Sequence, residues 1–441
     1  MAEARLTFPR DFLWGTATAA YQVEGSNANS SWHAWEQAGH IAAAGSAAQA
    51  CDWWGGRWRE DFDRAAETGQ NAHRFSVEWS RIEPEPGRWD EAALDRYRDM
   101  ARGLAERGLE PMATLHHFSD PLWLAETGGW VVDRTAAFEA FAVRVVEALK
   151  DHVRLWITFN EPNVYVTLGY ITGVFPPGAT DPFAAGRVMS HLLDAHIAAY
   201  HAIHRIRPDA QVGMAHHYRG MAPQRPWFPP DRWISAFHSR RFNEAFPRAL
   251  QTGRLRLPVG LPRASAARGT QDFFGLNYYT SDLVRFAPFA PRVLFGRRSF
   301  PEDAEVSPNG FIANRPAEFA RALRWAKGFG LPIYVTENGI EDASDRLRPR
   351  YLVEHLRQVW LAANFNWKIR GYFHWTLVDN FEWGNGWTQR FGLWELDLQT
   401  QARRMRPSAG LYAEICRANA LSSEMVARYA PEVFAGMFPN E

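Results

Sequence analysis

Short apolar runs alternate with longer amphipathic stretches along most of this 441-residue chain. Helical periodicity is clearest in residues 60–69, 91–108, 134–152 and 350–365. The alternation predicts βα units around a parallel sheet. Eight runs have the composition of buried strands: Phe12–Ala17, Ala72–Val77, Pro111–His116, Leu155–Asn160, Gln211–Ala215, Phe273–Asn277, Pro332–Thr336 and Gly371–Trp375.

Eight such units favour one α/β architecture, a single (β/α)8 TIM barrel with extended βα loops. We expect residues 1–441 to form a single TIM-barrel catalytic domain whose extra length lies in loop insertions. A doubly wound open sheet is the alternative. The first expected strand lacks the glycine-rich phosphate turn that a dinucleotide-binding sheet of that kind needs.

Polar and aromatic side chains gather where the expected strands end. In a TIM barrel these positions converge on the face where active sites are built. Taken alone, Glu161 before Pro162 could simply cap a helix. That explanation does not extend to the whole set, which therefore predicts a site. Its members are Arg74, His116, His117, Asn160, Glu161, His216, His217, Asn277, Tyr278, Glu337 and Trp375.

Two carboxylates stand out in this set, in "LWITFNEP" and "YVTENGI". Glu161 follows the fourth expected strand and Glu337 the seventh, so they should face each other across the mouth of the barrel. Two opposed carboxyls are the equipment for cleaving a glycosidic bond, with one protonated and the other ionised. Arg74 is the candidate for holding one of them ionised. The residues alone leave open which glutamate has which role.

The composition of the chain limits the classes of binding partner to be expected. Lys plus Arg and Asp plus Glu both number 49, so no global field attracts nucleic acid or an anionic membrane. The N-terminus does not resemble a signal peptide and no apolar run is long enough to span a membrane, so a cytoplasmic location is expected. The chain has two cysteines, Cys51 and Cys416, and the sequence does not decide whether they form a disulfide bond. Aromatic residues beside polar ones, as in "CDWWGGRW" and "DNFEWGNGW", suit a pocket for an amphipathic small molecule.

Two other functions compete with glycosidic cleavage. Histidine pairs at two strand ends, His116–His117 and His216–His217, could hold a metal. However, adjacent strand residues face opposite sides, so each pair offers about one inward ligand, and neither H-x-H nor H-E-x-x-H spacing occurs. A carbohydrate-binding protein without activity would not need both carboxylates. We therefore expect an enzyme without metal or cofactor.

Several motifs in order along the chain give a specific resemblance. They are "FLWGTATAAYQVEG" (12–25), "NAHRFSVEWSRI" (71–82), "TFNEP" (158–162), "VTENG" (335–339), "GYFHWTLVDNFEW" (371–383) and "RFGL" (390–393). Together they resemble glycoside hydrolase family 1, the retaining β-glycosidases, over essentially the whole chain. The resemblance implies Glu161 as acid/base and Glu337 as nucleophile, with Arg74 and Tyr278 near the nucleophile. It also implies a sugar subsite made of Gln22, His117, Asn160, Trp375, Glu382 and Trp383.

The resemblance further implies an exo-acting β-glucosidase that tolerates β-galactosides or β-fucosides and works through a covalent glycosyl-enzyme intermediate. Glu382 would repel a phosphate, so an unphosphorylated sugar is expected, and Glu161 is retained where thioglucosidases have Gln. Two positions depart from the family pattern: Phe118 and Asn163 stand where Trp is common. Phe118 lacks an indole donor, which bears on sugar preference, and Asn163 is expected to alter the entrance. Aglycone choice and oligomeric state are not readable.

Overall fold

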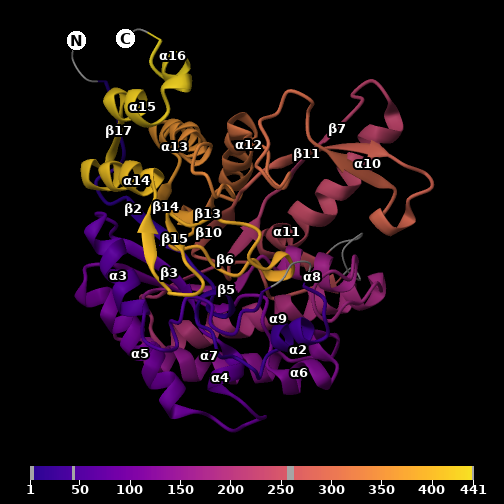
Figure 1. The fold of residues 1–441 in the computed structure, drawn as a ribbon. Coiled ribbons are helices and arrows are strands. Elements are labelled where there is room, and N and C mark those ends of the chain that lie inside the picture. The colour runs from indigo at the N-terminus through magenta and orange to yellow at the C-terminus, as the bar shows by residue number, and fades with distance from the viewer. Residues whose placement is uncertain (1–3, 42–44, 256–262, 440–441) are drawn as a thin grey trace.

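The computed structural model describes residues 4–41, 45–255 and 263–439, and within them eight parallel strands close into a barrel (Figure 1). Around the ring, each strand pairs with the barrel strand that comes next in the chain. β14, the last of the eight, closes the ring by pairing with β2, the first. The predicted TIM barrel is confirmed. The strands are β2 (Leu13–Ala17), β3 (Ala72–Ser76), β4 (Glu110–His116), β5 (Leu155–Asn160), β6 (Gln211–His217), β10 (Phe273–Asn277), β13 (Ile333–Asn338) and β14 (Ile369–Trp375).

Two strands run further at their carboxyl ends than the sequence pattern predicts. β13 continues to Asn338, so Glu337 lies inside the strand rather than after it. Its pairing with β14 shifts register between Val335 and Asn338, the kind of irregularity that re-aims a side chain. β6 continues to His217, two residues past the expected end. Both extensions add polar residues, which an apolar-run criterion does not detect.

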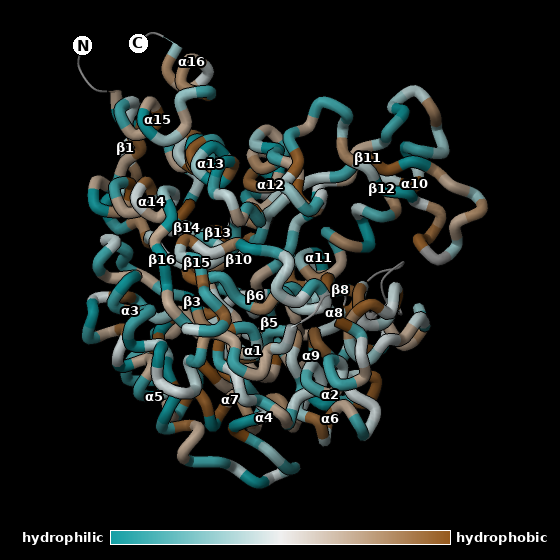
Figure 2. Tube along the Cα trace, in the orientation of Figure 1, coloured by the Kyte–Doolittle hydropathy of each residue, from teal (hydrophilic) through white to brown (hydrophobic). Residues whose placement is uncertain are grey.

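Helices surround the barrel, and the four predicted helical ranges are confirmed to within a few residues. In α5 (Glu91–Glu106), Asp90 accepts the Ala93 N–H at 2.9 Å as N-cap, and Leu94, Tyr97 and Leu104 face the interior. Hydrophobic and hydrophilic residues accordingly alternate along the helices (Figure 2). The other main helices are α3 (Trp58–Glu67), α7 (Thr135–Leu149), α8 (Pro162–Tyr170), α9 (Pro182–Ile206), α12 (Pro316–Lys327), α13 (Arg348–Asn364) and α14 (Pro407–Ala418).

Insertions that follow β6 and β10 form a lobe at one side of the barrel, at the upper right of Figure 1. Its sheet contains β7 (Gly220–Pro223), β11 (Ser281–Phe286) and β12 (Gly296–Ser299), covered by α10 (Pro229–Ser239). A π-helical turn, η2 (Arg240–Glu244), joins α10 to α11 (Ala245–Thr252). We refer to residues 220–252 and 281–299 as the lobe.

Short helices and strands lie between the larger elements and near the chain ends. Cys51 and Cys416 are both free and buried, so the disulfide that the sequence left open is absent. Within the described ranges, none of the helices is long and apolar enough to cross a membrane. The short elements are β1 (Arg5–Thr7), α1 (Ala20–Val23), α2 (Ser31–Gln37), α4 (Trp79–Ile82), α6 (Leu122–Glu126), η1 (Gly129–Val131), β8 (Arg254–Leu255), β9 (Arg263–Ala264), η3 (Pro291–Val293), η4 (Trp383–Asn385), β15 (Trp394–Leu396), β16 (Arg403–Met405), β17 (Ala420–Ser422), α15 (Ser423–Tyr429), η5 (Pro431–Val433) and α16 (Phe434–Met437).

Candidate active site

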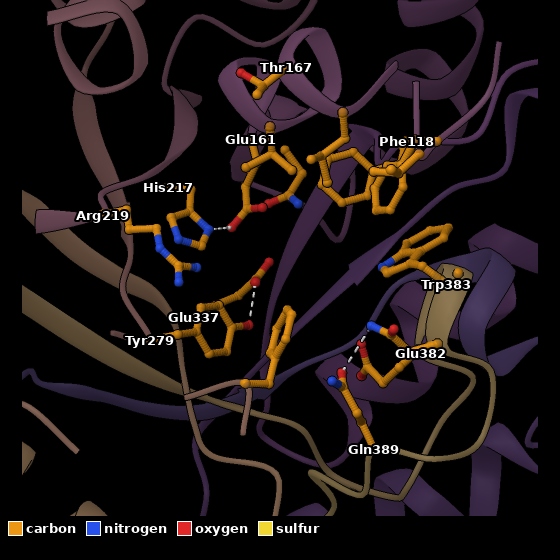
Figure 3. A pocket seen from close by; sticks show the side chains of 18 of the residues that line it. Phe118, Glu161, Thr167, His217, Arg219, Tyr279, Glu337, Glu382, Trp383 and Gln389 are labelled. Atoms are coloured by element: carbon orange, nitrogen blue, oxygen red, sulfur yellow. Dashed lines mark hydrogen bonds and ion pairs between the residues drawn. The ribbon is translucent and has the colours of Figure 1, made fainter. Parts of the chain in front are cut away.

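A cavity of about 690 Å³ opens at the carboxyl ends of the barrel strands. Glu161, which follows β5, and Glu337, in β13, both line it, and Figure 3 shows their carboxyl groups directed toward the same space. The two strands are three places apart around the ring, because β6 and β10 lie between them. The predicted convergence of two carboxyls distant in the sequence is therefore present.

Glu337 lies beside a buried cation. Its Oε1 accepts a hydrogen bond from Arg74 Nη1 at 2.7 Å, and its Oε2 accepts one from the Tyr279 hydroxyl at 2.6 Å. Burial raises the pKa of Glu337 to about 7, Arg74 opposes that shift, and the charge of Glu161 adds to it. Arg74 makes its ion pair with Glu337 and not with Glu161, so this cation stabilises negative charge on Glu337.

Glu161 occupies a different environment. It is the N-cap of α8 and has φ of 44°, a left-handed conformation that is uncommon for a non-glycine residue. His217 Nδ1 lies 2.9 Å from its Oε1, and Asn277 Nδ2 lies 2.8 Å from the same oxygen. Both of these contacts fall on Oε1 of the Glu161 carboxyl.

The hydrogen-bond directions follow from Arg74, since a guanidinium can only donate. Arg74 Nη2 donates to Asn160 Oδ1 at 2.6 Å, which fixes the orientation of that amide. Asn277 Nδ2 donates to the same Asn160 oxygen at 3.1 Å, so Asn277 also donates to Glu161. Glu161 Oε1 is therefore an acceptor, and His217 must donate to it from Nδ1. One hydrogen-bond network thus links the two carboxyls through Arg74, Asn160 and Asn277.

The same reasoning gives the tautomer of His117. Asn160 Nδ2 donates to His117 Nε2 at 2.9 Å, so the imidazole carries its proton on Nδ1. That nitrogen is buried and has no partner within the described residues. Burial lowers the pKa of His117 well below its usual value, and the charge of Arg74 acts in the same direction. A neutral imidazole with an unused N–H at the cavity wall is suited to bind a hydroxyl group.

Glu382 and two indole rings form the opposite end of the cavity from Arg219 (Figure 3). Trp375 Nε1 donates to Glu382 Oε1 at 3.0 Å, and Trp383 stacks on His117 with ring centroids 5.8 Å apart. Burial raises the pKa of Glu382 to about 8, opposed by the Trp375 hydrogen bond. Gln22 lies against Glu382 and donates to the Phe381 carbonyl at 2.7 Å, leaving its Oε1 without a partner within the described ranges.

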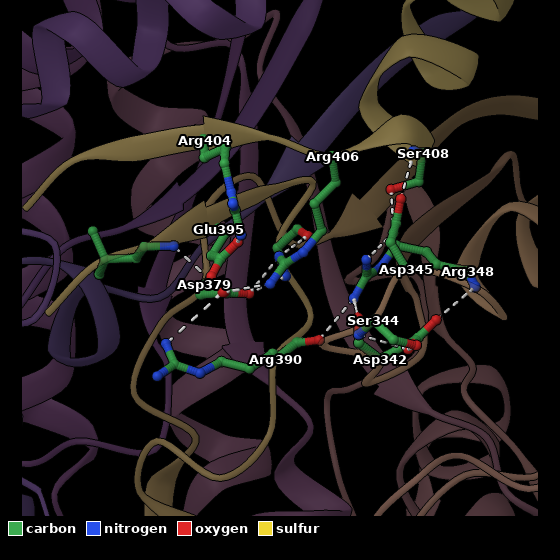
Figure 4. Close-up of polar contacts among 12 residues, drawn as sticks. Asp342, Ser344, Asp345, Arg348, Asp379, Arg390, Glu395, Arg404, Arg406 and Ser408 are labelled. Carbon is green, nitrogen blue, oxygen red and sulfur yellow. Dashed lines mark hydrogen bonds and ion pairs between the residues drawn. The ribbon is translucent and has the colours of Figure 1, made fainter.

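A buried ion network holds the loop that carries Glu382 and Trp383 (Figure 4). Asp379 accepts hydrogen bonds from Arg406 Nη1 and Nη2, both at 2.9 Å, and from the Gly392 N–H at 2.9 Å. Arg348 Nη2 donates to the Arg390 carbonyl at 2.8 Å. Both sides of the loop are thereby tied to α13 and to the start of α14. The position of Glu382 in the cavity therefore depends on this buried ion network.

The structure corrects two expectations. The phenol that reaches Glu337 belongs to Tyr279, whereas the Tyr278 hydroxyl contacts Ser281 and the Arg315 carbonyl away from the cavity. Alternation along the chain after β10 explains this, because Asn277 and Tyr279 face one side and Tyr278 the other. Asn163 does not shape the entrance: it is buried, and its Nδ2 donates to the His217 carbonyl at 2.9 Å.

The histidine pairs divide between the cavity and the barrel wall. His117 and His217 line the cavity, while His116 and His216 do not, as the alternation argument predicts. Within the described ranges, no cluster of three or more His, Cys, Asp or Glu side chains could hold a metal ion. Sequence reasoning missed the role of His217 as a partner of Glu161 and the position of Gln389 in the cavity wall. The position of His217 at the carboxyl end of β6 was the available signal for its role.

Comparisons with known proteins agree with this geometry. The model of the family described as Glycosyl hydrolase family 1 matches residues 4–421. β-Glucosidase A of Thermotoga maritima is 34% identical over 94% of this chain and 98% of its own length. A β-galactosidase of Pyrococcus woesei is 30% identical over 95% and 98%.

Solved structures give the same result at the level of the fold. A β-glycosidase from Pyrococcus horikoshii has a TM-score of 0.89 and 36% identity, covering 97% of this chain and 98% of its own. The Thermotoga maritima β-glucosidase in complex with glucoimidazole has a TM-score of 0.87 and 31% identity, covering 94% and 100%. This chain belongs to glycosyl hydrolase family 1 and is a retaining β-glycosidase.

Proposed function

We propose that Glu337 is the nucleophile and Glu161 the acid/base of a two-step double displacement. The observation that carries this assignment is the ion pair between Arg74 and Glu337, with the Tyr279 hydroxyl on the second oxygen. These contacts favour the ionised form of Glu337. Glu161 instead has both of its contacts on Oε1, which leaves Oε2 as the site for a transferable proton. Residues 1–441 act as one catalytic domain in this proposal.

In the first step, a Glu337 oxygen attacks the anomeric carbon and the bond from that carbon to the leaving oxygen breaks. The proton on Glu161 moves to the leaving oxygen, and a glycosyl ester of Glu337 forms. In the second step, water attacks the anomeric carbon, the ester bond breaks, and Glu161 takes the proton of the water. Loss of the negative charge of Glu337 in the ester removes its repulsion of Glu161, so Glu161 is ionised and available to accept a proton in this step.

The substrate of this proposal is a small β-glucoside cleaved at its non-reducing end, with β-galactosides or β-fucosides also accepted. His117, Asn160 and Glu382 line the cavity and offer polar atoms to ring hydroxyls, and Trp375 offers an apolar face. Gln22 is not part of the cavity lining but lies against Glu382 with its Oε1 unpartnered among the described residues. Relatives named as β-glucosidases and β-galactosidases support both sugars. The Thermotoga maritima enzyme has also been solved in complex with galacto-hydroximolactam.

Two variants test the assignment. Glu337→Gly is expected to abolish hydrolysis of p-nitrophenyl β-glucoside but to transfer glucose from α-glucosyl fluoride to an acceptor sugar, because the fluoride occupies the space of the missing ester. Glu161→Ala is expected to regain turnover of an activated aryl glucoside when azide is added, with β-glucosyl azide as product. Unchanged hydrolysis in Glu337→Gly would refute the nucleophile, and no azide product from Glu161→Ala would refute the acid/base.

A further inference from the structure

Three arginines gather at the side of the cavity that faces the lobe. Arg219 follows β6, Arg241 lies in η2 and Arg298 lies in β12. Among the described residues, the one carboxylate within ion-pair distance of any of them is Asp282. The group therefore carries more positive than negative charge. Both Arg219 and Arg298 line the same cavity as Glu161 and Glu337.

Both carboxylate oxygens of Asp282 are hydrogen-bonded to Arg219. Arg219 Nε and Nη2 donate to its two oxygens at 2.6 and 2.8 Å, a bidentate ion pair. Arg298 is left with a longer contact, 3.8 Å from Nη1 to Asp282 Oδ2, and a third of its side chain is exposed, at 33%. Arg298 therefore offers most of its donors to whatever enters the cavity.

Arg241 adds a further positive charge to this group from a buried position. It is 8% exposed, and Nη1 donates to Thr167 Oγ1 at 3.2 Å, while Nε has no partner within the described residues. Thr167 itself lines the cavity. Burial lowers the pKa of Arg241 to about 10, with the charge of Arg298 acting in the same direction. At neutral pH the side chain stays charged, and an anion nearby would relieve the repulsion between these two arginines.

The surrounding wall is apolar. Val164 and Leu168 of α8, Val174 after that helix, and Phe242 of the π-helical turn all line the cavity on the side of Glu161. A site that combines an apolar wall with an uncommitted guanidinium is suited to an amphipathic anion.

We propose that the cavity takes β-glycosides whose aglycone is an apolar or aromatic group bearing a carboxylate, with Arg298 as the residue that binds the carboxylate and Arg219 positioned beside it. This inference rests on the proposed function and names its substrate class. Arg219 stands two residues after His217, which contacts Glu161, so the arginines lie on the Glu161 side of the cavity.

The test compares two substrates that differ only in charge: the 4-O-β-glucosides of 3-(4-hydroxyphenyl)propanoate and of the corresponding propanamide. Their phenol leaving groups are nearly equivalent, so the ratio of kcat/KM values reports binding of the charge. For the unmodified enzyme we expect the carboxylate to be favoured by about tenfold at low salt, as for one hydrogen-bonded ion pair, and less at 0.5 M salt.

Arg298→Gln is expected to bring this ratio to within about threefold of unity, since it removes one charge-assisted hydrogen bond. Arg297→Gln is the matched control, because Arg297 is the exposed neighbour on β12, alternates to the other face and does not line the cavity. It should keep the ratio of the unmodified enzyme. Both substrates are measured with the same enzyme preparation. The ratio of their kcat/KM values therefore does not depend on the fraction of that enzyme that is folded.

The outcomes separate this inference from the proposed function. Equal kcat/KM values for both substrates with the unmodified enzyme, or the same preference in Arg298→Gln as in the unmodified enzyme, would overturn the carboxylate site while leaving the glucosidase activity in place. No hydrolysis of either substrate, or of p-nitrophenyl β-glucoside, would instead overturn the proposed function.

Discussion

The Glu382 end and the Arg219 end of the cavity obtain their polar groups in different ways. At the Glu382 end, barrel strands and the loop after β14 supply buried side chains, and the direction of several hydrogen bonds follows from Arg74. At the Arg219 end, the lobe supplies arginines that have too few carboxylate partners among the described residues. The first arrangement presents a fixed set of donors and acceptors. The second leaves the positive charge of Arg298 available to a bound substrate.

The two ends of the cavity are suited to two different kinds of specificity. A residue in a barrel strand is held by pairing on both sides, so its side chain is preorganised for the transition state. Residues on inserted segments can vary without disturbing the barrel, and the part of the substrate that leaves is recognised there. We therefore expect changes at the Glu382 end to alter kcat or stability, and changes at the Arg219 end to alter the choice of aglycone.

The largest effect is expected from the ion network below the Glu382 loop. Asp379→Ala leaves Arg406 buried without its carboxylate, which costs about 3–5 kcal/mol of unfolding free energy. The melting temperature should fall by many degrees, and KM for p-nitrophenyl β-glucoside should rise because the loop carrying Glu382 is released. Thermal unfolding followed by circular dichroism and steady-state kinetics measure both.

A neighbouring ion pair provides the control. Glu395 pairs with Arg404 at the surface, close to the same network in Figure 4, and Arg404 is 80% exposed. Glu395→Ala is expected to change the unfolding free energy by at most about 1 kcal/mol, since water screens this pair. An equal loss of stability in the two variants would contradict the view that the buried network anchors the loop.

The next effect concerns the hydroxyl that contacts the nucleophile. Tyr279→Phe removes a hydrogen bond to the Glu337 carboxylate, worth about 1.5–3 kcal/mol, so kcat should fall by about 10- to 150-fold. Tyr278→Phe is the matched control on the preceding residue, and its kcat should stay within about threefold of the unmodified enzyme. A larger loss in Tyr278→Phe than in Tyr279→Phe would mean that the structure assigns the wrong phenol.

These two tyrosines also show how far the sequence could lead. The barrel and the convergence of Glu161 with Glu337 were predictable, because strand ends in a TIM barrel share one face and the order of strands fixes which residues are opposed. The choice between Tyr278 and Tyr279 depended on following alternation past the strand, where a one-residue error exchanges the two faces. Arg298 was not predictable, since it reaches the cavity from β12 of the lobe, which no strand-end argument places.

A smaller effect is expected from the pH dependence of stability at the Glu382 end. Burial raises the pKa of Glu382 to about 8 in the folded protein, above its ordinary value of 4.5. The folded state therefore binds a proton that the unfolded state releases between these values. The contribution of this group to stability is fully present below about pH 4.5 and is lost as pH rises through 8.

Glu382→Gln removes this titration. The melting temperature of the variant minus that of the unmodified enzyme should therefore become more positive between pH 5 and pH 8, in the absence of ligand. Glu432→Gln, at an exposed position, serves as the control for loss of a carboxylate and should show a smaller change with pH. A difference for Glu382→Gln that is constant or falls over this range would contradict the raised pKa.

The smallest effect is expected where this chain departs from the family pattern. Phe118 lines the cavity and packs edge-on against Trp383, with ring centroids 5.2 Å apart. Phe118→Trp adds an indole N–H without removing an apolar contact, so it can donate one neutral hydrogen bond to a sugar hydroxyl, worth about 0.5–1.5 kcal/mol. The KM for p-nitrophenyl β-glucoside should fall by about two- to tenfold while kcat changes little. Because the added donor acts on ring hydroxyls and not on the aglycone, the ratio of carboxylate to amide substrates should stay unchanged, and a shift in that ratio would show that the two ends of the cavity are not independent.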